Sequence, residues 1–329
     1  MSTRPYIIIP IVLFIFTENL CAQNYATVDQ IVKEYSSVWP YPEDLAKQIN
    51  HDFSTQAEKA RAIYDWIAYN ISYDTKKYFS QDMYTTPYYV HSLIKIEKSY
   101  FIEAPYRIYM AEEAMYTKKT LCEGYASLYK RLADLTGLEC VIIPGYAKML
   151  PEDIGRKPAS VNHTWNAVKT DGQWQLLDVT WGAGKLDYDK NIFIRDFSDA
   201  YFFVPPERFF LQHCPKSLKW SFTDKTMEDF IALPFFYREY ISWGIDIIEP
   251  EKGLFYTSEK IRIKFRIKNF PKNTDLSYTI KEGGPWITIY PRWKAGITTF
   301  TINVNVRHET YLTIFTLSHA IATYKIIPR

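Results

Sequence analysis

The sequence predicts an α+β protein whose carboxyl-terminal part is entirely β. Three observations lead to this prediction. Apolar residues recur at helical spacing in segments 55–71 and 122–136, a hairpin signal lies within segment 161–181, and apolar and polar residues alternate after residue 234. A chain of 329 residues, of which 47% are apolar, can form one large domain or two ordinary ones.

The amino end predicts a signal peptide over residues 1–22. Arg4 precedes an apolar stretch from Tyr6 to Phe16, and Ala22 is the small residue before the expected cleavage point. The stretch is too short to span a bilayer as a helix. Cys21 offers a second interpretation, a lipoprotein cleavage site, but the residues in front of it are not small. We therefore expect a secreted or periplasmic mature chain with no membrane span.

The overall charge argues against nucleic-acid binding. The chain has 39 basic and 37 acidic residues and a net charge of +2, whereas nucleic-acid-binding domains usually carry a strongly basic patch. Tyrosine and phenylalanine are abundant, with 27 and 20 copies. An aromatic core is the simplest explanation, and an aromatic groove for peptide or carbohydrate is the alternative.

The first strong helix signal begins with a capping box. Thr55 and Glu58 stand three residues apart, in front of apolar residues at helical spacing from Ala60 to Ile71. The next segment, 76–119, is rich in tyrosine and is interrupted by prolines such as Pro105. We expect it to form an irregular insertion that borders a groove.

A cysteine opens the second predicted helix, which runs from about Cys122 to Thr136. Its apolar side chains fall on one face, and Gly137 stands where a helix usually ends. At a helix amino terminus the exposed N–H groups and the helix dipole favour thiolate over thiol, which makes the sulfur nucleophilic at neutral pH. A small buried core residue is the competing interpretation, and position alone does not decide between the two.

A predicted hairpin places a histidine and an aspartate on one face. Asp171-Gly172 is a strong two-residue turn signal between strands at 161–168 and 173–181, so residue 170 should pair with residue 173. His163 and Asp178 are then diagonal neighbours, about 7–8 Å apart at the backbone and within reach of a hydrogen bond. A three-residue turn would instead place Asp178 on the opposite face.

Cys122, His163 and Asp178 follow one another in an order that suits cysteine acyl-transfer chemistry. The thiolate would attack a carbonyl carbon, the imidazole would hold and return the proton, and the carboxylate would orient the imidazole. A core histidine beside Trp165 and a turn or surface aspartate are the competing interpretations. Zinc is a further alternative, but one cysteine and one histidine 41 residues apart form a poor ligand set. We predict no metal and no other cofactor.

The remaining cysteines and histidines receive no functional role. Cys140 lies in an apolar run and is interpreted as a core residue, while a disulfide between Cys140 and Cys214 is left open. Either way, Cys122 stays unpaired once Cys21 has been removed. The other histidines, His213 among them, are scattered along the chain and are interpreted as structural.

Two alternating segments predict strands of a small β-sandwich over residues 245–329. Apolar residues from Ile261 to Ile267 and from Phe300 to Val306 alternate with polar ones, the pattern of a strand with one buried face. We interpret the basic residues of the first segment as a solvated face or as an edge protected by charge. Contact with an anionic glycan or another cell-surface polymer is the lesser alternative. These basic residues are Arg262, Lys264, Arg266 and Lys268.

Together these motifs resemble the transglutaminase-like superfamily, and more closely its kyphoscoliosis-peptidase-like bacterial members. The resemblance covers roughly residues 45–235. It implies a papain-like α+β core over residues 23–240, with the cysteine helix packed on an antiparallel sheet that bears the histidine and the aspartate, followed by an Ig-like β-sandwich. The matching motifs are Lys59–Ile67, Asn70–Asp74, Cys122–Ala126, Pro144–Lys148, Asn162–Val168, Leu176–Gly184, Tyr201–Glu207 and Pro215–Trp220.

The resemblance also implies an activity. Family members act as peptidases, amide-forming transferases or deamidases, and some are inactive. We therefore predict an exported cysteine peptidase that acts on peptide or protein amide bonds through a thioester on Cys122. The alternatives are a protein-glutamine transglutaminase or deamidase with the same triad, and a catalytically silent module that binds a cell-surface protein or glycan.

Overall fold

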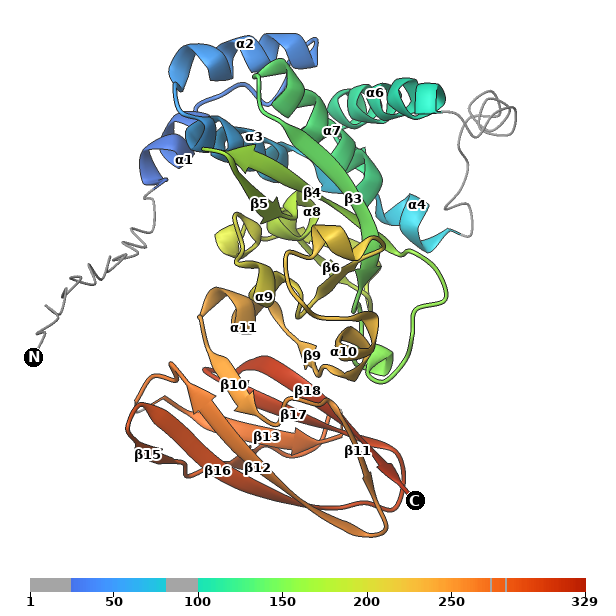
Figure 1. Cartoon of the computed structure of the whole chain (residues 1–329), viewed down its shortest axis with the longest axis vertical. Coiled ribbons are helices and arrows are strands. Elements are labelled where there is room, and N and C mark those ends of the chain that lie inside the picture. Colours follow the sequence, from blue (N-terminus) through green and yellow to red (C-terminus); the bar gives the residue numbers. More distant parts are fainter. Residues whose placement is uncertain (1–24, 81–99, 273, 282) are drawn as a thin grey trace, which may run out of the picture.

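Helices and sheets separate into layers along the long axis of the molecule (Figure 1). The computed structural model describes residues 25–80, 100–272, 274–281 and 283–329. Helices gather at one end, a four-stranded antiparallel sheet follows, and a four-stranded and a six-stranded sheet form the opposite end. The observed class is α+β, as predicted. The predicted signal peptide, residues 1–22, lies outside the described residues.

The longest helices, α3, α6 and α7, form the helical layer with α1 and α2. The helices are α1 (Ala26–Lys33), α2 (Pro42–Asp52), α3 (Gln56–Asn70), α4 (Thr75–Phe79), α6 (Tyr100–Thr117), α7 (Cys122–Leu135), α8 (Val179–Ala183), α9 (Pro206–Phe209), α10 (Met227–Ala232) and α11 (Arg238–Ser242).

The described strands form one central sheet, two further sheets near the carboxyl end, and two short pairs. The central sheet has the order β5-β4-β3-β8. The strands are β1 (Ser72–Tyr73), β2 (Lys119–Thr120), β3 (Cys140–Ala147), β4 (His163–Thr170), β5 (Gln173–Leu177), β6 (Gly184–Asp187), β7 (Ile192–Arg195), β8 (His213–Pro215), β9 (Phe235–Phe236), β10 (Asp246–Glu249), β11 (Leu254–Thr257), β12 (Lys260–Lys268), β13 (Leu276–Ile280), β14 (Ile287–Thr288), β15 (Arg292–Lys294), β16 (Ile297–Asn305), β17 (Thr310–Thr316) and β18 (His319–Pro328).

Both predicted helices are present with the expected ends. Thr55 and Glu58 form the capping box of α3, and Gly137, with φ +79°, follows the end of α7. Near the start of α7, a Cβ on Gly124 would lie 1.8 Å from the hydroxyl oxygen of Thr120. Glycine at this position therefore lets the first turn of α7 pack directly against β2.

The predicted hairpin is present in the predicted register. Thr170 pairs with Gln173, and both turn residues have positive φ, +50° for Asp171 and +79° for Gly172. These angles suit the right-handed twist of the two strands. The prediction that the second strand reaches residue 181 is wrong, because β5 ends at Leu177. Asp178 instead caps the short helix α8, since its side chain accepts hydrogen bonds from two amides of the first turn.

The insertion at 76–119 is more regular than predicted where it is described. Helices α4 and α6 occupy much of it, and segment 81–99 lies outside the described residues. Pro105 lies within α6 without ending it. Ala111, Ala114 and Met115 of this helix belong to the same apolar core as α7. Packing of this face therefore overrides the local helix-breaking signal of the proline.

Near the carboxyl end, two sheets pack face to face, as the alternating pattern predicts. One has the order β10-β12-β16-β15 and the other β11-β18-β17-β13-β14, with β9 also paired to β18. Phe265 and Phe300 stack across β12 and β16, and Phe265 meets the ring of Tyr324 from β18 edge-on. Strand β12 lies between two neighbours, so its basic residues form a solvated face and not a sheet edge.

The apolar core of the two facing sheets continues into the central sheet. Ile143, Trp165 and Leu176, from β3, β4 and β5, belong to the same buried cluster as Phe265 and Tyr324. The opposite face of the central sheet contributes to a separate cluster shared with α3 and α7. The central sheet is therefore covered on both faces, by helices on one side and by the carboxyl-terminal half of the chain on the other.

Two features concern cysteines and membranes. Cys122, Cys140 and Cys214 are all free thiols, so the disulfide that the sequence left open is not formed. Among the described helices, none combines the length and the apolar character that a membrane crossing requires.

Candidate active site

A partly exposed thiol lies at the start of α7. Cys122 is the first residue of this helix, whereas Cys140 and Cys214 are buried. It lines a cavity of about 1120 Å³ whose wall also includes His163 and Trp181. The first N–H groups of a helix lack intrahelical partners, so the backbone here presents hydrogen-bond donors beside the sulfur.

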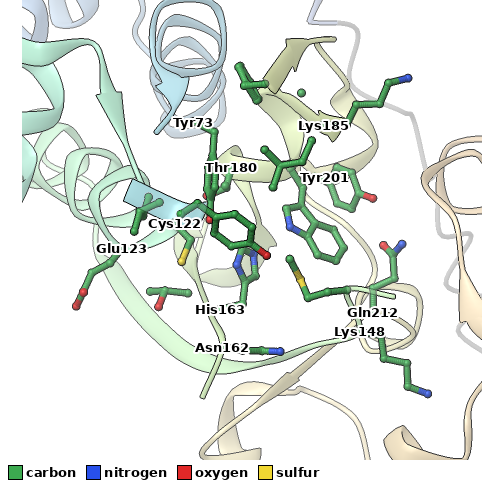
Figure 2. A pocket seen from close by; sticks show the side chains of 18 of the residues that line it. Tyr73, Cys122, Glu123, Lys148, Asn162, His163, Thr180, Lys185, Tyr201 and Gln212 are labelled. Carbon is green, nitrogen blue, oxygen red and sulfur yellow. The ribbon is translucent and has the colours of Figure 1, made fainter. Parts of the chain in front are cut away.

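His163 lies between the thiol and a buried carboxylate. Its Nε2 atom is 2.6 Å from Oδ2 of Asp178, and the thiol of Cys122 lies beside its imidazole. Because Nε2 is engaged by the carboxylate, the sulfur is left to Nδ1. Figure 2 shows the Cys122 sulfur and the imidazole together in the pocket. The structure thus brings all three predicted residues into one chain of contacts.

The carboxylate of Asp178 is fully enclosed and is bonded through both oxygens. Oδ1 accepts hydrogen bonds from the backbone N–H groups of Thr180 at 2.9 Å and Trp181 at 3.2 Å, both in the first turn of α8. Oδ2 faces His163. A buried charge is tolerated when such donors replace the lost water, so the short helix fixes the plane of the carboxyl group.

A second imidazole, from His213 on β8, contacts the same oxygen. Its Nε2 atom is 2.9 Å from Oδ2 of Asp178, and its side chain is 0% exposed. The sequence interpretation of His213 as a scattered structural histidine missed this contact. A local pattern does not reveal it, because β8 reaches the site only by pairing with β3, where His213 lies opposite Ala147.

The electrostatics of the cluster favour a charged histidine beside a charged aspartate. Burial alone would lower the pKa of His163, but the charge of Asp178 and the hydrogen bonds to Asp178 and Cys122 outweigh burial and raise it to about 10. Burial would raise the pKa of Asp178, but the nearby His163 and His213 hold it well below its usual range. For His213, burial dominates and lowers the pKa, so this second ring is neutral.

Aromatic side chains cover the cluster. The indole of Trp181 stacks on the His163 ring, with ring centroids 5.3 Å apart. The ring of Tyr73, from β1, lies in the same pocket (Figure 2). Burial raises the pKa of Tyr73, and the thiol of Cys122 in the same pocket raises it further. Its hydroxyl has no hydrogen-bond partner within the part of the chain that the structure describes.

The two histidines and the aspartate are also a conceivable ligand set for a metal ion. Their donor atoms all lie within 4.8 Å of one another. Both imidazole contacts to Oδ2 have hydrogen-bond lengths, 2.6 and 2.9 Å, and each uses the ring nitrogen that a metal would need. The geometry therefore fits a hydrogen-bonded cluster better than a metal site.

A protein-family match covers the part of the chain that holds most of this site. Residues 43–190 match the family described as DUF553, transglutaminase-like domain. This part of the chain is a transglutaminase-like domain. The matched residues include Cys122, His163 and Asp178, whereas His213 lies beyond them.

The curated relatives of this transglutaminase-like domain are distant. Kyphoscoliosis peptidase of Homo sapiens is 26% identical over 218 residues, which cover 65% of this chain and 30% of the relative. Hillarin of Drosophila melanogaster is 27% identical over 225 residues, which cover 64% of this chain and 24% of the relative. The chain thus spans less than a third of the length of these relatives.

Among solved structures, the crystal structure of a TGase covers 57% of this chain and 40% of its own, with 15% sequence identity and a TM-score of 0.28. This overall similarity is low, and the assignment to the family does not depend on it.

Proposed function

We propose that the chain is an exported cysteine peptidase that cleaves peptide or protein amide bonds through a thioester on Cys122. One observation carries the proposal: the thiol, His163 and Asp178 form a continuous chain of contacts at the wall of a large cavity. The packing of α7 on the central sheet supports a papain-like core. Export, and an Ig-like role for the carboxyl-terminal sheets, remain part of the proposal.

The contacts suggest a role for each residue in a covalent mechanism. The Cys122 thiolate attacks the amide carbonyl carbon, and the resulting oxyanion collapses with loss of the amine, which takes a proton from His163. Water then attacks the thioester carbon while His163 accepts its proton, and the acid leaves with the thiol restored. Asp178 keeps the imidazole in the tautomer and orientation that both steps need.

Two donors are positioned to stabilise the oxyanion. The backbone N–H of Cys122 is the first, because the amide at the start of a helix has no intrahelical acceptor. The hydroxyl of Tyr73 is the second, since it lines the same pocket as the sulfur and has no partner among the described residues. Both would meet charge that develops only as the carbonyl is attacked.

We expect Tyr73→Phe to lower kcat by about 10²-fold with little change in KM, because a donor to the oxyanion acts mainly in the transition state. Steady-state rates on a peptide substrate would measure this. Tyr188→Phe, a change of another phenol on the cavity wall, is the matched control and should stay within a few-fold of the unaltered protein. A normal kcat for Tyr73→Phe would exclude the hydroxyl as the second donor.

The acyl acceptor decides between hydrolysis and transfer. The same thioester could react with a primary amine, as in a protein-glutamine transglutaminase, or release a deamidated glutamine side chain. The cavity wall combines aromatic rings with charged residues such as Lys77 and Lys185, and these contacts do not select water over an amine.

The proposal is tested by incubating the mature chain, residues 23–329, with an unfolded protein and with a glutamine peptide, with and without a primary amine. Mass spectrometry would separate backbone cleavage, amine incorporation and deamidation. We expect backbone cleavage that is unaffected by a metal chelator. Loss of activity with a chelator would favour a metal site instead. The absence of all three products, together with ordinary alkylation of Cys122, would favour a binding module.

A further inference from the structure

We propose that His213 is a positioning residue for the active site and donates its Nε2–H to Asp178. The inference rests on the proposed function, because it assigns a role to a fourth side chain of the same cluster. The carboxylate oxygen can only accept a hydrogen bond, so the 2.9 Å contact requires the proton to be on Nε2 of His213.

Each carboxylate oxygen of Asp178 has two hydrogen-bond partners. Two amides of α8 hold Oδ1, and two imidazoles share Oδ2. Without His213, Oδ2 would accept a hydrogen bond from His163 alone. The carboxyl group would then be free to rotate toward His163. The second imidazole thus fixes the direction in which Asp178 faces the first and helps it stay ionised.

His213 is itself held rigidly. Its ring stacks on Phe209 with centroids 4.1 Å apart and an interplanar angle of 16°, and it contacts Trp181 with centroids 4.4 Å apart. Its backbone belongs to β8, which pairs with β3. The neighbouring Gln212 donates a hydrogen bond to the carbonyl of Phe236, which lies in the strand added to the carboxyl-terminal sheet. A side chain with so little freedom is suited to orienting another.

A charged His213 would not suit this role. A charged His213 would compete with His163 for the Asp178 carboxylate and would make the His163 imidazolium easier to deprotonate. The thiolate would then lose the positive charge beside it. Burial keeps His213 neutral, so it can donate one hydrogen bond without adding charge. The two histidines that contact Oδ2 therefore differ in charge state, and of the two only His163 also lies beside the thiol.

The test compares two substitutions at this position. His213→Phe keeps a ring between Phe209 and Trp181 but removes the donor, and it should lower kcat by about 10–100-fold with little change in KM. His213→Gln keeps an N–H that can reach Oδ2, and it should stay within a few-fold of the unaltered protein. Cys214→Ala, which alters a buried neighbour that does not contact Asp178, is the control for a general loss of packing.

Two measurements keep the outcomes separate. The rate of Cys122 alkylation in the unaltered protein tests the proposed function, and slow, ordinary alkylation would end that proposal whatever the substitutions show. If alkylation is fast but His213→Phe turns over normally, or if His213→Gln loses as much kcat as His213→Phe, the positioning role is wrong. Should His213→Phe fail to fold, ¹⁵N spectra of the unaltered histidines decide, because a proton on Nδ1 and none on Nε2 of His213 would overturn the inference.

Discussion

Replacing Cys122 with serine should abolish turnover, by about 10⁴-fold or more, while the protein stays folded. A serine hydroxyl holds its proton far more tightly than a thiol, so the helix terminus and His163 cannot generate a serine alkoxide as the nucleophile. The side chain is partly exposed and serine is nearly the same size, so the free energy of unfolding should change by less than about 1 kcal/mol. Steady-state kinetics and thermal unfolding would measure the two effects.

Alkylation provides an independent readout for the same residue. Iodoacetamide should modify Cys122 at neutral pH well before the other thiols. Burial raises the pKa of Cys214 to about 12 and that of Cys140 still further, so both stay protonated and shielded. Cys140→Ser is the control and should leave the fast modification intact. Fast modification that persists in Cys122→Ser would show that the reactive thiol lies elsewhere.

Replacing Asp178 with asparagine should lower kcat by about 10³–10⁴-fold. Asparagine can still cap α8, because its carbonyl can accept the amides of Thr180 and Trp181. Its NH₂ group would then face the two imidazoles where a carboxylate oxygen stood. His163 could accept that bond only with its proton on Nδ1, and that proton would then face the sulfur. The imidazole would no longer be able to take the thiol proton.

The same substitution should shift the pH dependence. The pKa of His163 is about 10 because Asp178 outweighs the effect of burial. Without that charge, burial should bring the pKa below the ordinary 6.5, so activity that depends on the imidazolium would be lost at a much lower pH. A pH–rate profile whose alkaline limb stays in place in Asp178→Asn would contradict this account.

The free energy of unfolding should depend on pH through the His163–Asp178 pair. The raised pKa of His163 contributes stability that is complete below pH 6.5 and is lost as the pH rises toward 10. The lowered pKa of Asp178 contributes stability that is present above pH 3.8 and is lost as the pH falls. The difference in unfolding free energy between the unaltered protein and Asp178→Asn should therefore be greatest between about pH 4 and 6.5, and denaturant titrations at several pH values would measure it.

Much of the site could be predicted because its three residues follow from local rules. A two-residue turn fixes the hairpin register, and register alone places His163 and Asp178 on one face. The apolar spacing and the terminal glycine fix the helix that begins at Cys122. The contact between the helix and the hairpin depends on packing, so local rules do not predict it. The resemblance to the transglutaminase-like superfamily was the only basis for expecting it.

The residues that the sequence did not reveal depend on contacts between distant segments. His213 reaches Asp178 across 35 positions because β8 completes the sheet beside β3. Helix α6 forms in spite of Pro105 because one of its faces is buried with α7. The end of β5 was predicted too late because Asp178 forms hydrogen bonds with the amides that follow it, and this ends the strand.

The order of strands in the central sheet bears on how such a protein can be divided. The family match ends at residue 190, but strand β8, which borders β3, and much of the apolar cover of the sheet come from later residues. The matched stretch is therefore shorter than the stretch that packs around the central sheet. A gene fusion or truncation at residue 190 would carry the thiol into a new protein without the surroundings that orient its partners.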